Sequence, residues 1–176
     1  MNLSKQKIII IDGPMGSGKT TTANLLYKKF KYTAFLGLDR IKWFVSEFPR
    51  TYKANQMTAK VILAMCECYL NCGMTVVIEQ SFRKKSVMKP YLDISKKKNI
   101  PILVYELTAP KEILIDRVKH RVNICPVKKK LPFWRRLLNI NAYPHKPFAP
   151  VRLMFDSSKL SAGQIVNQII KDIKAA

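Results

Sequence analysis

Residues 8–26 read IIIIDGPMGSGKTTTANLL. An apolar run leads into a glycine-rich loop, and a lysine, three threonines and an apolar helix follow. The loop and its lysine fit the pattern G-x-x-x-x-G-K-[ST], in which glycines let the chain wrap while successive backbone N–H groups point at phosphate oxygens. The positive end of the following helix dipole strengthens this attraction. The stretch therefore predicts a binding site for the phosphates of a nucleotide.

The predicted cofactors are ATP and Mg²⁺, because each part of this pattern has a role toward them. Lys19 is expected to reach the β- and γ-phosphates as a catalytic residue, and the Thr20 hydroxyl to coordinate Mg²⁺. A glycine turn without a ligand is the alternative, which the strand–loop–helix context disfavours. The residues expected to bind the nucleotide are Gly13, Pro14, Met15, Gly16, Ser17, Gly18, Lys19, Thr20 and Thr21.

Short apolar strands alternate with helices along all 176 residues. This alternation predicts a single α/β domain in three layers, with a five-stranded parallel sheet that helices cover on both faces. Strands are expected at residues 7–12, 33–38, 74–79, 101–107 and 151–156. Helices are expected at residues 18–30, 40–48, 55–71, 83–98, 110–121 and 161–175.

Acidic residues gather where these strands end, and ligands bind at the carboxyl ends of parallel strands. Asp39 follows the second strand, where a carboxylate could orient a hydroxyl or accept its proton. The competing interpretation makes Asp39 the N-cap of a helix that begins at Arg40, and the spacing favours neither. Glu79 ends the third strand, where an acid could hold Mg²⁺ through water. An ordinary acid at a strand end is an equally good interpretation of Glu79.

Two arginines precede the part of the chain that is richest in proline. Arg117 and Arg121 are four residues apart, so they share one helix face. Together they could clamp a transferring phosphate through paired hydrogen bonds and neutralise its charge. The alternative is that they belong to a solvated helix face.

The chain is strongly basic, with 32 lysines and arginines against 11 acids and a formal charge of +21. Such a field attracts polyanions, and no acid lies between Asp116 and Asp156. Within that stretch, residues 122–150 form a basic insertion with interleaved aromatics, a pattern suited to single-stranded nucleic acid. Its LPFWRRLL segment could instead lie on an anionic membrane, and an ordered insertion whose aromatics pack on the domain is a third interpretation. The aromatic residues are Phe133, Trp134, Tyr143 and Phe148.

Four cysteines are present, and three of them fall in the segment MCECYLNCG at the end of an expected helix. Their spacing does not let them converge as metal ligands do, so we expect reduced thiols and neither a disulfide nor a metal site. The chain shows no signal-peptide pattern and no apolar run long enough to span a membrane, so a cytoplasmic protein is expected. The cysteines are Cys66, Cys68, Cys72 and Cys125.

Five segments together resemble the small P-loop kinases of the nucleoside- and shikimate-kinase type. Within that set the chain is most similar to the group of chloramphenicol phosphotransferase, zeta toxins and polynucleotide 5′-kinases. The segments are IIIIDGPMGSGKTT, FLGLDRIKWFVSEFP, GMTVVIEQSF, VYELTAPKEILIDRVKHR and FDSSKLSAGQIVNQI. The first is specific for nucleotide binding, and the others are looser patterns. The resemblance implies one P-loop NTPase domain over residues 1–176, with a lid insertion at about 122–150.

The resemblance also implies roles for single residues. Asp39 falls where this group has its catalytic aspartate, and Arg117 and Arg121 fall on the arginine pattern that precedes the lid. The segment 155–159 falls near the adenine pocket of related kinases.

Two positions depart from the family pattern. Polynucleotide kinases tend to have Asp-x-x-Arg where this chain has Asp39 followed by Lys42, and a lysine cannot grip a phosphate bidentately. Glu79 stands where the group more often has aspartate, which weakens the expectation that it serves the metal.

The expected activity is transfer of the γ-phosphoryl group of ATP to a hydroxyl of a small-molecule acceptor. One alternative is a polynucleotide 5′-hydroxyl kinase, with nucleic acid bound through the basic insertion. The other is a nucleotide-binding regulatory module without transferase activity. A membrane surface is not expected as a partner.

Overall fold

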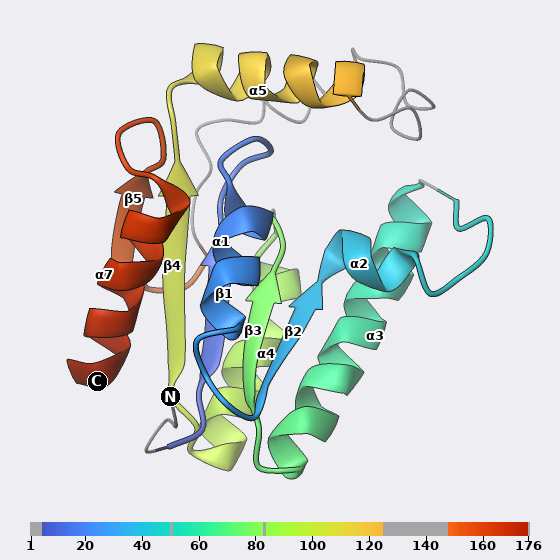
Figure 1. Cartoon of the computed structure of the whole chain (residues 1–176). Helices are drawn as coiled ribbons and strands as arrows, with labels where there is room; N and C mark the ends of the chain where they lie inside the picture. The colour runs from blue at the N-terminus through green and yellow to red at the C-terminus, as the bar shows by residue number, and fades with distance from the viewer. Residues whose placement is uncertain (1–4, 50, 83, 125–147, 176) are drawn as a thin grey trace.

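The computed structural model describes residues 5–49, 51–82, 84–124 and 148–175. In this part of the chain five strands form one parallel sheet in the order β2-β3-β1-β4-β5 (Figure 1). The strands are β1 (Ile8–Asp12), β2 (Thr33–Gly37), β3 (Thr75–Glu79), β4 (Ile102–Thr108) and β5 (Leu153–Asp156). The helices are α1 (Lys19–Tyr27), α2 (Leu38–Lys42), α3 (Tyr52–Asn71), α4 (Lys85–Lys98), α5 (Lys111–Ile124) and α7 (Ala162–Ala175). The predicted fold class is confirmed.

Strand β1 lies in the middle of the sheet and consists of four isoleucines followed by Asp12. Because successive side chains of a strand point to opposite faces, Ile8 and Ile10 pack in one core and Ile9 and Ile11 in the other. All four isoleucines are fully buried. An uninterrupted apolar run is what a strand covered on both faces requires.

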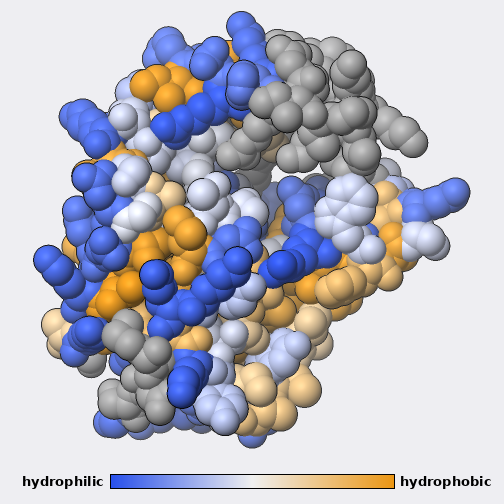
Figure 2. Space-filling view, viewed as in Figure 1, coloured by the Kyte–Doolittle hydropathy of each residue, from blue (hydrophilic) through white to orange (hydrophobic). Residues whose placement is uncertain are grey.

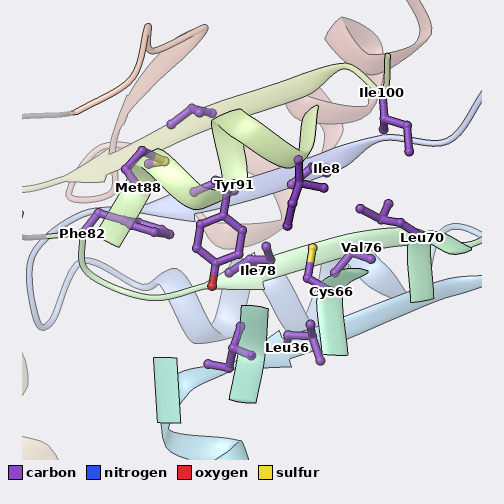
Figure 3. Close-up of a cluster of buried hydrophobic side chains, with 14 of the residues drawn as sticks. Ile8, Leu36, Cys66, Leu70, Val76, Ile78, Phe82, Met88, Tyr91 and Ile100 are labelled. Carbon is purple, nitrogen blue, oxygen red and sulfur yellow. The ribbon is translucent and has the colours of Figure 1, made fainter. Parts of the chain in front are cut away.

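Helices α3 and α4 cover one face of the sheet, and α1 and α7 cover the other (Figure 1). Figure 3 shows the first core, where Met88 and Tyr91 of α4 lie among Ile78 of β3 and Cys66 of α3. Because every strand runs in the same direction, the carboxyl ends of the strands share one edge of the sheet, which we call the carboxyl edge. The turns into α1, α2 and α5 all begin there (Figure 1).

Helix α2 is shorter than the helix expected at residues 40–48. It ends at Lys42, and only hydrogen-bonded turns continue the chain to Val45. The side chains of Trp43 and Phe44 are exposed, so no burial supports a longer helix. Glu47 then takes a left-handed backbone conformation, with φ at 51°.

Helix α3 begins at Tyr52, three residues before the predicted start at Asn55. Thr51 is its N-cap, and the Thr51 hydroxyl accepts a hydrogen bond of 3.2 Å from the backbone N–H of Ala54. Threonine is a favoured residue at this position because its side chain satisfies one of the unpaired N–H groups of the first turn.

Candidate phosphate-transfer site

The loop between β1 and α1 depends on glycines. Gly13, Gly16 and Gly18 have φ values of 137°, 87° and 90°, in the region that residues with a side chain rarely adopt. A Cβ on Gly13 would lie 2.1 Å from the backbone oxygen of Leu107, and one on Gly16 would lie 2.9 Å from that of Leu114. The loop is therefore held against β4 and α5 at two points where only glycine fits.

Lys19 is the first residue of α1 and is buried within the loop that precedes it. Its Nζ donates a hydrogen bond of 2.7 Å to the backbone oxygen of Pro14, across the loop. Thr20 and Thr21 follow in the first turn of the helix, and both are exposed. The structure thus brings the predicted lysine and threonines together at the start of one helix.

Asp12 fixes the entrance to the loop. It is fully buried, and its Oδ1 accepts hydrogen bonds from the backbone N–H groups of Gly13, at 2.6 Å, and Phe82, at 3.0 Å. The Ser81 hydroxyl donates to the backbone oxygen of Gly13 at 2.8 Å. Asp12 is therefore a positioning residue, a role that sequence reasoning missed, and the signal for it is an acid at the end of an otherwise apolar strand.

Glu79 ends β3 between the two neighbouring strands, in register with Ile11 of β1 and Gly37 of β2. Its side chain is almost fully buried, and its Oε2 lies 3.3 Å from the position that a Cβ on Gly37 would take. Glu79 is thus at the carboxyl edge, one strand away from the phosphate loop.

Asp39 lies in the first turn of α2, directly after β2, and its side chain is 84% exposed. The N-cap of α2 is Gly37, so the interpretation of Asp39 as the N-cap of a helix starting at Arg40 is wrong. Lys42 pairs with the Asp39 carboxylate, with 3.1 Å between Nζ and Oδ1. The structure therefore leaves this carboxylate open to solvent at the carboxyl edge, with a cation beside it.

Arg117 joins the phosphate loop to the loop after β5. Its Nη1 donates to the backbone oxygen of Gly16, at 3.3 Å, and to the Ser157 hydroxyl, at 2.8 Å, while its Nη2 donates to the Ser157 backbone oxygen at 2.6 Å. The sequence places Ser157 only within the segment 155–159, and its contact with Arg117 was missed because the two residues are 40 positions apart. Arg121 lies one turn further along α5, and its side chain is outside the described residues.

The segment after β5 is ordered by Asp156. Hydrogen bonds from the Ser158 hydroxyl, at 2.5 Å, and the Ser158 backbone N–H, at 2.9 Å, lower the pKa of the Asp156 carboxyl below its ordinary value. The positive charges of Lys159 and Arg117 act in the same direction. The segment that the family resemblance places near adenine is thus a compact turn tied to the phosphate loop through Arg117.

The sequence of residues 8–133 matches a family model that is described as an AAA domain. The match covers well over half of the chain. The chain belongs to this family. No curated protein sequence matches it significantly.

Solved structures, kinases among them, share the fold of this AAA domain over nearly the whole chain. The APS kinase of Mycobacterium tuberculosis, in complex with AMPPNP and APS, aligns with a TM-score of 0.71 at 13% identity, over 98% of this chain and 99% of that one. A sugar kinase from a Janibacter species aligns with a TM-score of 0.64 at 17% identity, over 97% of both chains. The Deinococcus radiodurans tunicamycin resistance protein aligns with a TM-score of 0.64 at 17% identity, over 96% of both. At these identities the likeness shows the fold, which is that of the small P-loop kinases.

The residues of the AAA domain fit the predicted nucleotide and metal. The glycine cradle and the buried Lys19 supply the close backbone approach and the cation that phosphates need. The Thr20 hydroxyl and the Glu79 carboxylate are oxygen ligands, the kind that Mg²⁺ takes while it keeps several waters. Among the described residues no group of three acidic, histidine or cysteine side chains forms a complete metal cage, so Mg²⁺ would depend on phosphate and water oxygens as well.

The basic insertion of the AAA domain lies largely outside the described residues, and so do three of its four aromatic residues. The fourth, Phe148, packs partly buried against the core of α3 and α4, together with Ala149 and Val151. In the parts of the chain that the structure describes, no helix is long and apolar enough to cross a membrane.

Proposed function

We propose that this AAA domain is a kinase that transfers the γ-phosphoryl group of ATP to a hydroxyl of a small-molecule acceptor. The observation that carries the proposal is the placement of Asp39. An exposed carboxylate begins α2 at the same edge of the sheet as the phosphate loop, with Glu79 of β3 between the two. A carboxylate at this place could orient an approaching hydroxyl and accept its proton.

The proposed reaction uses Asp39 as the group that orients and deprotonates the acceptor. The acceptor oxygen forms a bond to the γ-phosphorus while its proton passes to the Asp39 carboxylate. The bond from the γ-phosphorus to the oxygen that bridges it to the β-phosphorus breaks, and ADP leaves. Mg²⁺, held by Thr20 and by Glu79 through water, would neutralise charge on the phosphates when bound.

Three further side chains stabilise the charge that builds up on the phosphate oxygens. Lys19 would leave the Pro14 oxygen and bond to the β- and γ-phosphates. Arg117 already touches the loop at Gly16 and, with Arg121 on the same helix, would neutralise charge in the transition state. AMPPNP in the APS kinase of the same fold supports an adenine nucleotide as the donor.

A screen with labelled ATP tests the proposal. The panel contains nucleosides, sugars, antibiotics and 5′-hydroxyl oligonucleotides, with Lys19→Ala as the blank. A labelled product in one class, lost in the blank, is the expected result. Asp39→Asn should lower kcat by about 10²- to 10⁴-fold and keep ATP binding. Unchanged turnover in Asp39→Asn would remove the catalytic assignment, and ATP binding without any transfer across the panel would favour a regulatory nucleotide-binding module.

A second candidate is a polynucleotide 5′-hydroxyl kinase, which the formal charge of +21 favours. Phosphate contacts release counterions, so binding of such an acceptor would weaken steeply with the logarithm of salt concentration. Neutralising Lys128, Lys129 and Lys130 would reduce that slope. An acceptor KM that does not change with salt would contradict this candidate and leave the small-molecule kinase in place.

A further inference from the structure

An aromatic side chain stands one helical turn beyond the proposed base. Trp43, the C-cap of α2, follows Asp39 by four residues, and residues with this spacing lie on the same side of a helix. The Trp43 backbone N–H still bonds to the carbonyl oxygens of Arg40 and Ile41, so the helical turn includes it. This spacing therefore places Trp43 and Asp39 on the same side of the turn that follows β2.

The indole of Trp43 is open to solvent although it is one of the largest apolar groups in the chain. Trp43 is 65% exposed and Phe44 is 73% exposed, whereas Phe82 and Tyr91, in the core between the sheet and helices α3 and α4, are buried. Helix α3, against which α2 packs, also exposes Met57 and Val61. In Figure 2 pale orange surface lies over α3, on the right of the view, below white and blue atoms, and a deeper orange patch lies on the left. An exposed apolar patch beside a site marks a surface that a ligand or partner covers.

The two cations of the same turn are engaged with other groups. The guanidinium of Arg40 lies over the ring of Phe35, 5.1 Å from its centroid, and Lys42 is paired with Asp39. Neither of these two contacts involves the indole of Trp43. This leaves the indole face available to a ring of the ligand.

We propose that Trp43 is the stacking platform for the acceptor and that the acceptor carries a flat aromatic ring close to its reactive hydroxyl. This inference rests on the proposed kinase function and specifies its substrate class. Side chains four apart on a helix have Cβ atoms roughly 5–6 Å apart, so the ring and the reactive hydroxyl lie in the same part of the acceptor. Nucleosides and aryl-substituted alcohols share this chemistry, whereas sugars and open-chain polyols lack it.

Fluorescence tests the platform directly, because the chain has two tryptophans. In a Trp134→Phe protein the emission comes from Trp43 alone. With saturating AMPPNP, adenosine or 4-nitrobenzyl alcohol should quench this emission in a saturable way, and glucose should not. If only adenosine quenches the emission in a saturable way, the acceptor is a nucleoside. If only 4-nitrobenzyl alcohol does so, the acceptor is an aryl-substituted alcohol. Equal, non-saturable responses to all three compounds would overturn the proposal.

Kinetics with matched variants provide the second test. Stacking on an aromatic side chain contributes enough that Trp43→Ala should raise the acceptor KM by roughly tenfold or more, with the KM for ATP unchanged. Trp43→Phe keeps a flat ring and should recover most of the loss. Met154→Ala is the control, because Met154 is 60% exposed on β5 at the other edge of the sheet and should leave both KM values unchanged.

The outcomes separate this inference from the proposed function. Transfer to a sugar, or an acceptor KM unchanged in Trp43→Ala, would overturn the platform and keep the kinase. If no compound of the panel is phosphorylated, the kinase proposal fails, and the fluorescence titration with AMPPNP still decides whether Trp43 binds an aromatic ring.

Discussion

Gly13 is the residue at which the phosphate loop leaves least space for a side chain. It combines a φ of 137° with a Cβ position 2.1 Å from the backbone oxygen of Leu107. Gly13→Ala should therefore lower the free energy of unfolding by at least about 1–3 kcal/mol from backbone strain alone, and ATP affinity should fall with it. Thermal unfolding and ATP titration measure the two effects.

Gly163→Ala is the matched control for this substitution. Gly163 lies in α7, and a Cβ there would meet no atom within 4 Å. Alanine in a helix is more stable than glycine by roughly 0.5–1 kcal/mol, so this variant should be as stable as the parent or more so. Equal effects of Gly13→Ala and Gly163→Ala would contradict the strain at the phosphate loop.

The cysteines of α3 and of its C-cap provide a second prediction at the scale of residues. Burial, together with the neighbouring charge of Glu67, raises the pKa of the Cys66 thiol to about 12, whereas Cys68 and Cys72 are exposed. Because the thiolate is the reactive form, iodoacetamide at pH 8 should label Cys68 and Cys72 in the folded protein and Cys66 only after unfolding. Peptide mapping by mass spectrometry distinguishes them, and rapid labelling of Cys66 in the folded protein would contradict its burial.

At the scale of elements, α5 is tied to the phosphate loop by one guanidinium. Arg117→Ala removes its bonds to Gly16 and Ser157, and hydrogen bonds to a charged group contribute about 1.5–3 kcal/mol. We expect a loss of stability in that range together with weaker ATP binding, measured by denaturant unfolding and by titration. Lys111→Ala, an exposed residue at the start of α5, should change neither. An Arg117→Ala protein with full stability would show that these contacts contribute little.

The elements themselves could be predicted from the sequence because their signals are local. The four isoleucines of β1 and the glycine loop predicted a buried strand and a phosphate site, and every expected strand is found. The length of α2 could not be predicted, because Trp43 and Phe44 are apolar enough for a core, yet the structure shows both side chains exposed. The hydrogen-bond partners of Arg117 could not be predicted either. Gly16 lies 101 residues from Arg117 in the sequence, and only the tertiary fold brings the two residues together.

At the scale of the whole molecule, Asp172 links the far edge of the sheet to α7. Its Oδ2 accepts a hydrogen bond of 2.7 Å from the Tyr105 hydroxyl of β4, and another from Nε of Arg152, which precedes β5. Burial opposes the ionised carboxylate, but these two hydrogen bonds and the charge of Arg152 outweigh it and hold the pKa of Asp172 below its ordinary value. The ionised form is therefore the one that the fold stabilises.

The pH dependence of stability follows from the lowered pKa of Asp172. In the unfolded chain an aspartate titrates near about 3.9, so this stabilisation is complete above that pH and is lost as the pH falls through the lower value of the folded protein. Asp172→Asn should lower the free energy of unfolding by about 1.5–3 kcal/mol at pH 7, and the difference from the parent should shrink below about pH 4, in urea titrations across that range. Asp93→Asn, which breaks an exposed pair with Lys89, should cost less than about 1 kcal/mol. The carboxylate would not hold α7 to the sheet if Asp172→Asn lowered the free energy of unfolding as little as Asp93→Asn does. The same conclusion would follow if the loss in Asp172→Asn stayed the same from pH 7 to below pH 4.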